Sequence, residues 1–522
     1  MKAATACQQC RLSKRKCIRP GPGQACSACQ QRSIKCSGEL QGQADSSSGP
    51  TPSEPSERIV SFDMSVELVE LYLDKIHDRP HSLFHPNTLR AQLRDGTAGD
   101  ALVYAICAIG SKFSAYPDRL GLEKRLAGEA KRLLQADIEN ICIRNIQICI
   151  LIATLSAGNC ETTPEALYFR VATSMAEIMD LNASTMVGSA IDREIVRRIW
   201  CSLYFADRWC FSGLGLRRHM DEFLGPSCSL PMDEMVFRCL EPSQADTLNV
   251  PWKPGVWTHI TMLTRYFGPI QDLNRRVARD DITPSQLGET VEQLGTQLEA
   301  WSETLPAEMK MSVQNLHAQQ NNGLGGPFVA LHLTYHHYST LLYFQFLEEQ
   351  SRPVSSTSNS RTYADRCKEH ALSFSSLLHL SRQIKSCETN YPTVGHMVTV
   401  SSSVLLHTLT LGDLSELEGA RRALNANFEL LIELQQYWPA TSAMISRLIT
   451  FQNLCLLSTE SHRLDGWMVK FLLEHSRPLG KRKLPCLPTI IDVESESIAS
   501  KTREWMQLGR YMDLSLPNAE NS

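Results

Sequence analysis

Six cysteines within the first 36 residues follow the spacing C-x2-C-x6-C-x8-C-x2-C-x6-C. The pattern is one three-cysteine half written twice, with an offset of 19 residues. Closely spaced cysteines of this kind are typical of metal sites, and a structural zinc ion takes four ligands in a tetrahedron. Six thiolates cannot fill two separate four-sulfur sites, so two zinc ions must share two sulfurs. The predicted ligands are Cys7, Cys10, Cys17, Cys26, Cys29 and Cys36.

Other uses of clustered cysteines fit this sequence less well. A disulfide framework needs an oxidising compartment, and the N-terminus lacks the apolar segment of a secretory signal. The spacing matches neither common ferredoxin pattern, and a redox C-x2-C would stand beside a βαβ pattern that is absent here. So short a segment with so few apolar side chains cannot fold alone, and we expect bound zinc to supply its folding energy.

The charge of the chain is unevenly distributed. Residues 1–40 hold eight cations and one anion, a formal charge of +7, whereas the whole chain carries −4. A basic head on an acidic body is typical of nucleic-acid binding. Residues 11–16 hold four cations, whereas the matching segment 30–35 holds two, so the first half is the predicted DNA face. A solvated basic surface and a nuclear-import signal are the alternative interpretations.

The cysteine pattern resembles that of the fungal binuclear zinc-cluster transcription factors. In that family the first and fourth cysteines bridge the two zinc ions, which implies that Cys7 and Cys26 do so here. The segment CRLSKRKC is similar to the family's first-repeat signature. The resemblance implies a nuclear, sequence-specific regulator of RNA polymerase II transcription.

The same resemblance assigns roles to the cations. Lys14 matches the family position that reads a guanine pair in CGG triplets, and lysine is a known partner of guanine O6 and N7. If a short helix starts after Cys10, Arg11 and Arg15 lie on the same face as Lys14. We assign Arg11, Arg15 and Lys16 to phosphates, which position a protein without reading sequence.

The segment after the zinc module is rich in Ser, Pro and Gly and almost without apolar residues. It predicts a disordered linker over residues 41–57. An apolar a/d spacing follows, but fewer than two heptads precede Pro80, too few to argue a coiled coil. We expect an amphipathic helix of the next domain, so monomeric binding and dimerisation through the body both stay open. The a/d residues are Val66, Val69, Leu73 and Ile76.

Apolar residues recur at helical spacing through the rest of the chain, which predicts a large all-α body. No apolar run reaches 18 residues, so no membrane span is expected. We divide the body into 58–350 and a C-terminal regulatory part, 351–522. The acidic and apolar residues of its last 30 positions fit an activation tail or a docking helix equally well. Polar interruptions at 314–326, 352–363 and 478–488 predict surface loops.

Residues 194–200 and 203–208 are similar to the fungal transcription-factor homology region, and the resemblance covers about residues 58–240. On one helix, four polar and aromatic residues of this segment form a single stripe. We expect an internal Arg–Asp network that braces helices, because buried charges need partners. The stripe consists of Arg197, Trp200, Tyr204 and Asp207.

Several further signals have an ordinary structural interpretation. Two sets of histidines at helical spacing lack the additional cysteine or carboxylate ligands that a metal site needs. The scattered later cysteines are expected to be small core residues. No catalytic motif is present, so we do not expect an enzyme. The histidines are His77, His81, His85, His332 and His336, and the cysteines include Cys107, Cys142, Cys201 and Cys455.

The sequence therefore predicts a small zinc-stabilised binuclear cluster module over residues 1–40, a disordered linker and a large all-α domain. The predicted function is a DNA-binding transcription factor with two zinc ions, acting on CGG-type sites and regulating, for example, a secondary-metabolite gene cluster. Its partners would be double-stranded DNA and the transcriptional machinery. The alternative is a regulator of nutrient catabolism whose helical body binds a small-molecule inducer.

Overall fold

The computed structural model describes residues 10, 16–18, 26–32, 59–182, 188–220, 230–241, 252–351 and 358–457. The chain divides into two compact units, Met1–Ile59 and Val60–Ser522. Over these described ranges the larger unit contains helices and no strands, which confirms the predicted all-α body. No helix in the described ranges is long and apolar enough to cross a membrane.

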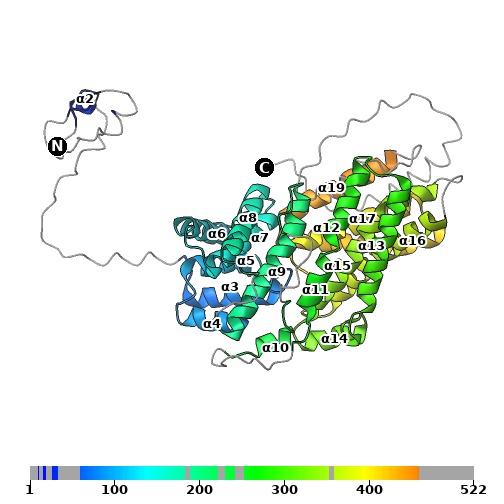
Figure 1. Ribbon diagram of the computed structural model, residues 1–522, viewed down its shortest axis with the longest axis horizontal. Coiled ribbons are helices and arrows are strands. Elements are labelled where there is room, and N and C mark those ends of the chain that lie inside the picture. Colours follow the sequence, from blue (N-terminus) through cyan, green and yellow to red (C-terminus); the bar gives the residue numbers. More distant parts are fainter. Residues whose placement is uncertain are drawn as a thin grey trace. The chain divides into compact units, whose positions relative to one another are not determined.

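The first part of the larger unit is a lobe of consecutive helices, drawn in blue to teal in Figure 1. Its helices are α3 (Phe62–Lys75), α4 (Pro86–Arg94), α5 (Asp100–Ser111), α6 (Arg119–Ala136), α7 (Ile143–Gly158), α8 (Thr162–Ile178) and α9 (Ala190–Gly213). The helix α5 packs against α3, α6 and α7, while α8 lies between α7 and α9. From Asn145 to Ser156 every residue of α7 is buried, as expected of a helix that is apolar on all sides.

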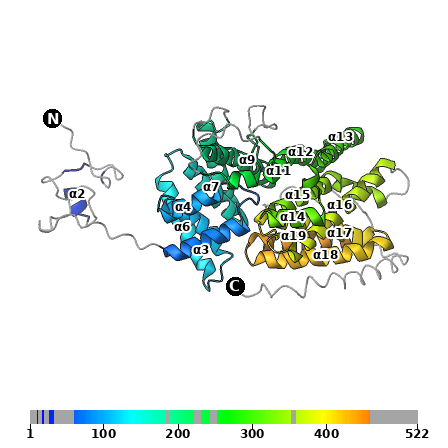
Figure 2. The same ribbon diagram turned by 90° about the horizontal axis from the view of Figure 1, so that it is seen from below.

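The second lobe is built around α15, which is buried apart from Tyr335 and His336. The helices α11, α12, α13, α14, α16 and α17 all pack against α15, and Figure 2 shows α17, α18 and α19 together on one side of it. The elements are α10 (Glu234–Arg238), α11 (Val256–Thr264), α12 (Phe267–Ala278), α13 (Pro284–Glu303), η1 (Ala307–Met309), α14 (Val313–Asn321), α15 (Gly325–Tyr343), η2 (Phe344–Ser351), α16 (Ser358–Gln383), α17 (Pro392–Leu411), α18 (Leu414–Gln435) and α19 (Ala440–Leu457).

Capping residues fix where several long helices begin. At the start of α9 the Ser189 hydroxyl accepts a bond from the Asp192 N–H at 3.1 Å, and the Asp192 carboxylate accepts from the Ser189 N–H at 3.1 Å. This reciprocal pair satisfies two backbone donors that have no partner inside the helix. The same device starts two other helices, with Thr283 and Gln286 at α13 and Asp413 and Glu416 at α18.

A buried lysine joins the two lobes. The Lys112 ammonium at the end of α5 donates to Glu123 at 2.8 Å, to Asn159 at 2.9 Å and to the carbonyl of Tyr437 at 3.1 Å. It also lies 4.9 Å from the ring centre of Trp438. Burial lowers the pKa of Lys112, and the Glu123 carboxylate acts in the opposite direction. Because each ammonium hydrogen has an acceptor, the charge is held inside the protein without an unpaired donor.

The helix expected after the linker is confirmed. Ser61 caps α3, and its hydroxyl accepts from the Met64 N–H at 3.2 Å. The helix is amphipathic and packs on α5, with Leu68, Val69 and Tyr72 buried. Its apolar face therefore belongs to the body of the protein.

The loop predicted over residues 314–326 is wrong. This segment contains α14 and the start of α15, and the Ser312 hydroxyl caps α14 by accepting from the Asn315 N–H at 3.1 Å. In α14 only Leu316 and Gln319 are buried, so its polar composition resembled that of a loop. The predicted loop at 352–363 becomes helix from Ser358 onward, and 478–488 lies outside the described residues.

Candidate zinc centre and the helical body

The described part of the smaller unit folds around buried cysteines. Cys10, Cys26 and Cys29 are each at most 3% exposed. The short helix α2 (Ser27–Gln30) begins after Cys26, whose carbonyl accepts from the N–H groups of Cys29 and Gln30 at 3.0 Å. This turn brings the two cysteines of the second C-x2-C to one side of the chain.

Three sulfurs from distant positions meet in this unit. The Sγ atoms of Cys10 and Cys26 lie 3.6 Å apart, and those of Cys10, Cys17 and Cys26 are all within 4.8 Å of one another. A tetrahedral zinc ion with Zn–S bonds of about 2.3 Å holds its sulfurs about 3.8 Å apart, whereas a disulfide needs about 2.05 Å. The donor set and its spacing therefore fit a zinc ion.

The sulfur group crosses the boundary between the two halves of the cysteine repeat. Cys10 and Cys17 belong to the first half, and Cys26 is the first cysteine of the second half. A backbone bond from the Ser27 N–H to the Ile18 carbonyl, at 3.0 Å, joins the same two halves. The halves therefore share one cluster of sulfurs and do not form two independent loops.

The other predicted residues of this unit are described less fully. Cys29 is buried beside the sulfur group, and Lys16 is exposed. Lys16 precedes the half-buried Cys17, and its charge is open to solvent. Five predicted site residues lie outside the described residues: Cys7, Arg11, Lys14, Arg15 and Cys36.

A buried charge network in the body is centred on Arg198 of α9. Its guanidinium donates to Glu194 at 2.8 Å, to the Ser82 hydroxyl at 3.0 Å and to the Met232 carbonyl at 2.7 Å. The same group lies 4.4 Å from the ring centre of Phe237. One side chain thus joins α9 to the turn after α3 and to the segment before α10.

Two carboxylates balance this buried arginine. Burial opposes the charge of Arg198, but the carboxylates of Glu194 and Glu234 outweigh it and raise the pKa of Arg198. The Glu234 carboxylate also accepts from the N–H groups of Val256 and Trp257, both at 2.9 Å, at the start of α11. Burial raises the pKa of Glu234, while Arg198 acts in the opposite direction. The network therefore fixes α9, α10 and α11 to one another.

A second network lies at the C-terminal end of α9. The Asp207 carboxylate accepts from Arg208 at 2.6 Å and from the backbone N–H groups of His219 and Met220 at 2.9 and 3.3 Å. Arg170 of α8 lies 3.7 Å from the same carboxylate. Asp207 and Arg208 are fully buried, so this pair holds the chain that leaves α9 against α8.

The predicted internal Arg–Asp network is thus present, and Tyr204 and Asp207 of the predicted stripe are buried, but the buried arginines are not the one that was predicted. Arg197 and Trp200 are only half-buried, whereas Arg198 and Arg208 are buried. The last turns of α9 are buried on every side, so no single stripe marks its inner face. Both arginines lie at helical pairing distance from Glu194, Arg197 at i+3 and Arg198 at i+4, so their spacing does not show which of them is buried.

The histidines have structural roles. His77 accepts from the Phe84 N–H at 3.2 Å, and His85 caps α4 by accepting from the Thr88 N–H at 3.3 Å. His332 bonds to a backbone carbonyl at 3.0 Å. Within the described residues the only group of three or more metal-ligating side chains close enough to hold an ion is the cysteine group. These contacts give His77, His85 and His332 structural roles, while His81 packs against aromatic rings and His336 contacts His370.

The later cysteines divide into two groups. Cys107 and Cys201 are buried core residues, as predicted. Cys142 is only half-buried and lines a cavity, and Cys160 and Cys239 are exposed, so the core interpretation does not hold for every cysteine. The side chain of Cys455 lies outside the described residues.

A small cysteine-rich metal module followed by a large helical body defines a zinc-dependent regulatory class of protein. Residues 5–43 match the fungal Zn(2)-Cys(6) binuclear cluster domain, and residues 69–303 match the fungal specific transcription factor domain. Together the two matches cover more than half of the chain. The chain belongs to the fungal binuclear zinc-cluster transcription factors, whose cluster domain holds two zinc ions. The second match continues past residue 240, where the motif resemblance ended, and stops at the end of α13, within the predicted division 58–350.

Curated relatives at low identity are named as transcriptional regulators or transcription factors. Two uncharacterized transcriptional regulatory proteins of Schizosaccharomyces pombe are 24% identical over 65% of this chain and 38% of the relative, and 22% identical over 86% and 78%. A Zn(2)-C6 fungal-type transcription factor of Fusarium oxysporum is 22% identical over 76% of this chain and 46% of its own length. The chain thus spans between about two fifths and four fifths of these relatives.

Proposed function

We propose that this protein is a sequence-specific DNA-binding transcription factor that recognises CGG-type triplets through its zinc cluster. The single observation that carries the proposal is the meeting of the Cys10, Cys17 and Cys26 sulfurs, which lies within the zinc-cluster match and encloses the basic segment 11–16. A cluster that fixes both ends of a short basic segment presents its cations on a rigid frame, as base recognition requires.

In this proposal the six cysteines bind two zinc ions. Cys7 and Cys26 bridge the ions, Cys10 and Cys17 complete one site, and Cys29 and Cys36 complete the other. The 3.6 Å separation of the Cys10 and Cys26 sulfurs supports a role for Cys26 in the site of the first half. The cluster is structural, because every thiolate is bound and none is left to react.

Lys14 reads the bases, and Arg11, Arg15 and Lys16 contact phosphates. Lys14→Ala should lower the preference for CGG over other triplets by about 1–3 kcal/mol while binding to random DNA survives. Fluorescence anisotropy with CGG and scrambled duplexes measures the specific and the non-specific affinity. An equal loss on both duplexes would contradict base reading by Lys14.

Arg11→Ala is the matched control for that substitution. It should weaken binding to all sequences and reduce the slope of log affinity against log salt by about one unit, since one phosphate contact is lost. Titrations at several salt concentrations measure the slope. An unchanged slope would exclude a phosphate contact at Arg11.

The proposed setting is the fungal nucleus, with double-stranded DNA and the transcriptional machinery as partners. The curated relatives described above are named as transcriptional regulators, which supports a regulatory and non-enzymatic role. Control of a secondary-metabolite gene cluster is the proposed biological output. Genome-wide mapping of bound DNA tests it, because the sites report the regulated genes and the half-site spacing distinguishes a monomer from a homodimer.

A second candidate function is regulation by a small-molecule inducer that binds the helical body, as in control of nutrient catabolism. A cavity in the first lobe favours it. The cavity has a volume of about 610 Å³, within the usual range of ligand pockets. Reporter assays with and without candidate nutrients test whether such a ligand changes transcription.

A further inference from the structure

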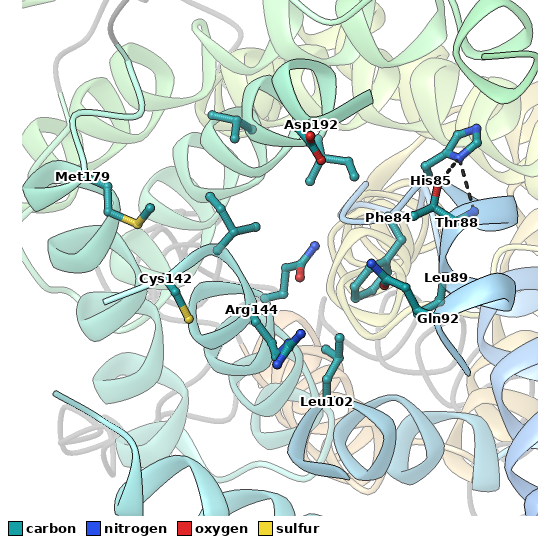
Figure 3. A pocket seen from close by; sticks show the side chains of 14 residues that line it. Phe84, His85, Thr88, Leu89, Gln92, Leu102, Cys142, Arg144, Met179 and Asp192 are labelled. Atoms are coloured by element: carbon teal, nitrogen blue, oxygen red, sulfur yellow. Dashed lines mark hydrogen bonds between the residues drawn. The ribbon is translucent and has the colours of Figure 1, made fainter. Parts of the chain in front are cut away.

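The residues that line the cavity in the first lobe limit the kinds of ligand that could bind there. Helices α4, α5, α7 and α9 supply its walls, and Figure 3 shows the side chains that line it. Its apolar surface includes the buried side chains of Phe84, Leu89, Leu102 and Val196. A surface of this kind accommodates an apolar body of drug-like size.

Most polar groups of the cavity are already engaged. The Gln147 side chain donates to the Leu83 carbonyl at 2.7 Å, and the His85 ring bonds the Thr88 hydroxyl at 2.8 Å. One Asp192 oxygen accepts from both the N–H and the hydroxyl of Ser189 at the start of α9. These groups therefore hold the walls in place and leave few free donors.

Arg144 at the start of α7 is the cation among the residues that line the cavity. It donates to the Thr97 carbonyl at 3.1 Å, and its side chain is exposed. Hydrogen bonds from Asn145 and Asn140 lower the pKa of the nearby Asp137 carboxyl, and the charge of Arg144 adds to this effect. Gly99, with a φ of +82°, leaves room for the guanidinium, since a side chain there would meet it at 3.3 Å. The arginine is thus held in position while its charge remains available.

Arg144 and Asp192 lie on opposite sides of the cavity in Figure 3. A carboxylate beside Arg144 gains charge-assisted bonds, and a second negative charge at the far side would face Asp192. We propose that this cavity binds an amphipathic monocarboxylic acid, with its carboxylate on Arg144 and its apolar body among Phe84, Leu89 and Leu102. This proposal names the ligand class for the second candidate function. Binding of the acid does not depend on that function, but an effect of the acid on transcription does.

The test measures binding directly, by fluorescence titration of the full zinc-loaded chain with pyrenebutyrate and with the neutral pyrenebutanol. The acid should bind about ten-fold more tightly than the alcohol, which corresponds to about 1.4 kcal/mol. Arg144→Gln should remove this preference by weakening the acid alone. Arg125→Gln, an exposed arginine of α6 away from the cavity, should leave both affinities unchanged.

A variant that fills the cavity with a larger side chain tests whether the ligand binds there. Ile143→Trp, at a half-buried position on the wall, should weaken acid and alcohol alike by about ten-fold or more. Equal affinities of acid and alcohol for the unmodified chain, an unchanged preference in Arg144→Gln, or unchanged binding to Ile143→Trp would each overturn the proposal. Affinity for a CGG duplex, measured on the same samples, reports the zinc cluster separately, so failure of this site and failure of the proposed DNA binding are distinguishable.

Discussion

The zinc-cluster unit and the helical body differ in what holds them together. Among the described residues of the small unit, the buried core consists of Cys10, Cys26 and Cys29, with Cys17 and Ala28 packed against it. The body instead buries whole helices, such as α7 and α15, around aromatic and aliphatic side chains. The first unit depends on metal ligation and the second on burial and internal charge pairs, so one chain combines two independent sources of stability.

Zinc removal is the largest perturbation that separates the two units. Treatment with phenanthroline should unfold the cluster and abolish DNA binding, because bound zinc contributes roughly 10–16 kcal/mol to small zinc modules. The helical signal in circular dichroism and its melting temperature should persist. A non-chelating phenanthroline isomer is the control, and joint melting of the body with zinc loss would break the comparison.

Cys26→Ser tests the contribution of a single zinc ligand to the cluster. Native mass spectrometry should show loss of both zinc ions, because the proposal gives this thiolate to both sites. Cys142→Ser, in the body, should retain two. Retention of two ions by Cys26→Ser would refute the shared ligand.

Within the body, the largest effect is expected at the buried arginine of α9. Arg198→Met leaves Glu234 buried without a cation and Glu194 with only the partly exposed Arg197, which should lower the free energy of unfolding by roughly 3–5 kcal/mol. Urea denaturation followed by circular dichroism measures the change, and affinity for a CGG duplex should hold where the variant remains folded.

Arg197→Met is the matched control for this substitution. Arg197 is the adjacent residue, contacts Glu194 at 3.2 Å and has a side chain that is 29% exposed. Its loss should cost at most about 1 kcal/mol, because a solvated pair contributes little. Equal losses at the two positions would show that burial does not determine the energy of this network.

A buried carboxyl should give the helical body a pH dependence of its own. Burial raises the pKa of Glu165 on α8 to about 7, although a hydrogen bond with the Cys210 thiol acts in the opposite direction. The pKa in the unfolded chain is about 4.3, so folding takes up a proton, and the body loses roughly 4 kcal/mol of stability as the pH rises from about 4 to 7.

Glu165→Gln should remove this loss and make the body more stable than the unmodified chain at pH 8. Urea denaturation across pH 5–8 measures it. Glu177→Gln, an exposed position on the same helix, is the control and should keep the original slope. A pH profile that Glu165→Gln leaves unchanged would contradict the role of this carboxyl.

The smallest effect tests packing between the lobes. At Gly158 of α7 a Cβ atom would lie 2.1 Å from the Trp438 ring, and Trp438 is held by its bond to the Asn390 carbonyl at 2.6 Å. Gly158→Ala should therefore destabilise the body by about 1–3 kcal/mol. At Gly128 of α6 nothing lies within 4 Å, so Gly128→Ala should stabilise by about 0.5–1 kcal/mol. Thermal melts of both variants show whether each substitution raises or lowers the melting temperature. A stabilising Gly158→Ala would contradict the close contact.

Some features could be predicted from the sequence because their signals are local. The helical class followed from apolar periodicity, and the amphipathic nature of α3 was visible before its packing on α5. On α9 the burial of Tyr204 and Asp207 was predicted, but Arg197 was chosen in place of Arg198, because both arginines can pair with Glu194. The polar helix α14 was mistaken for a loop, because its few buried residues, Leu316 and Gln319, give a weak periodic signal.

The sequence by itself determined the ligand chemistry, the basic segment beside it and the helical class, because ligand spacing, charge and periodicity are properties of neighbouring residues. Only the tertiary structure decided that Arg198 and not Arg197 is the buried arginine, and that four helices line a cavity with Arg144 at its side. Each of these depends on segments far apart in the chain, whose approach is set by packing and leaves no mark on local spacing.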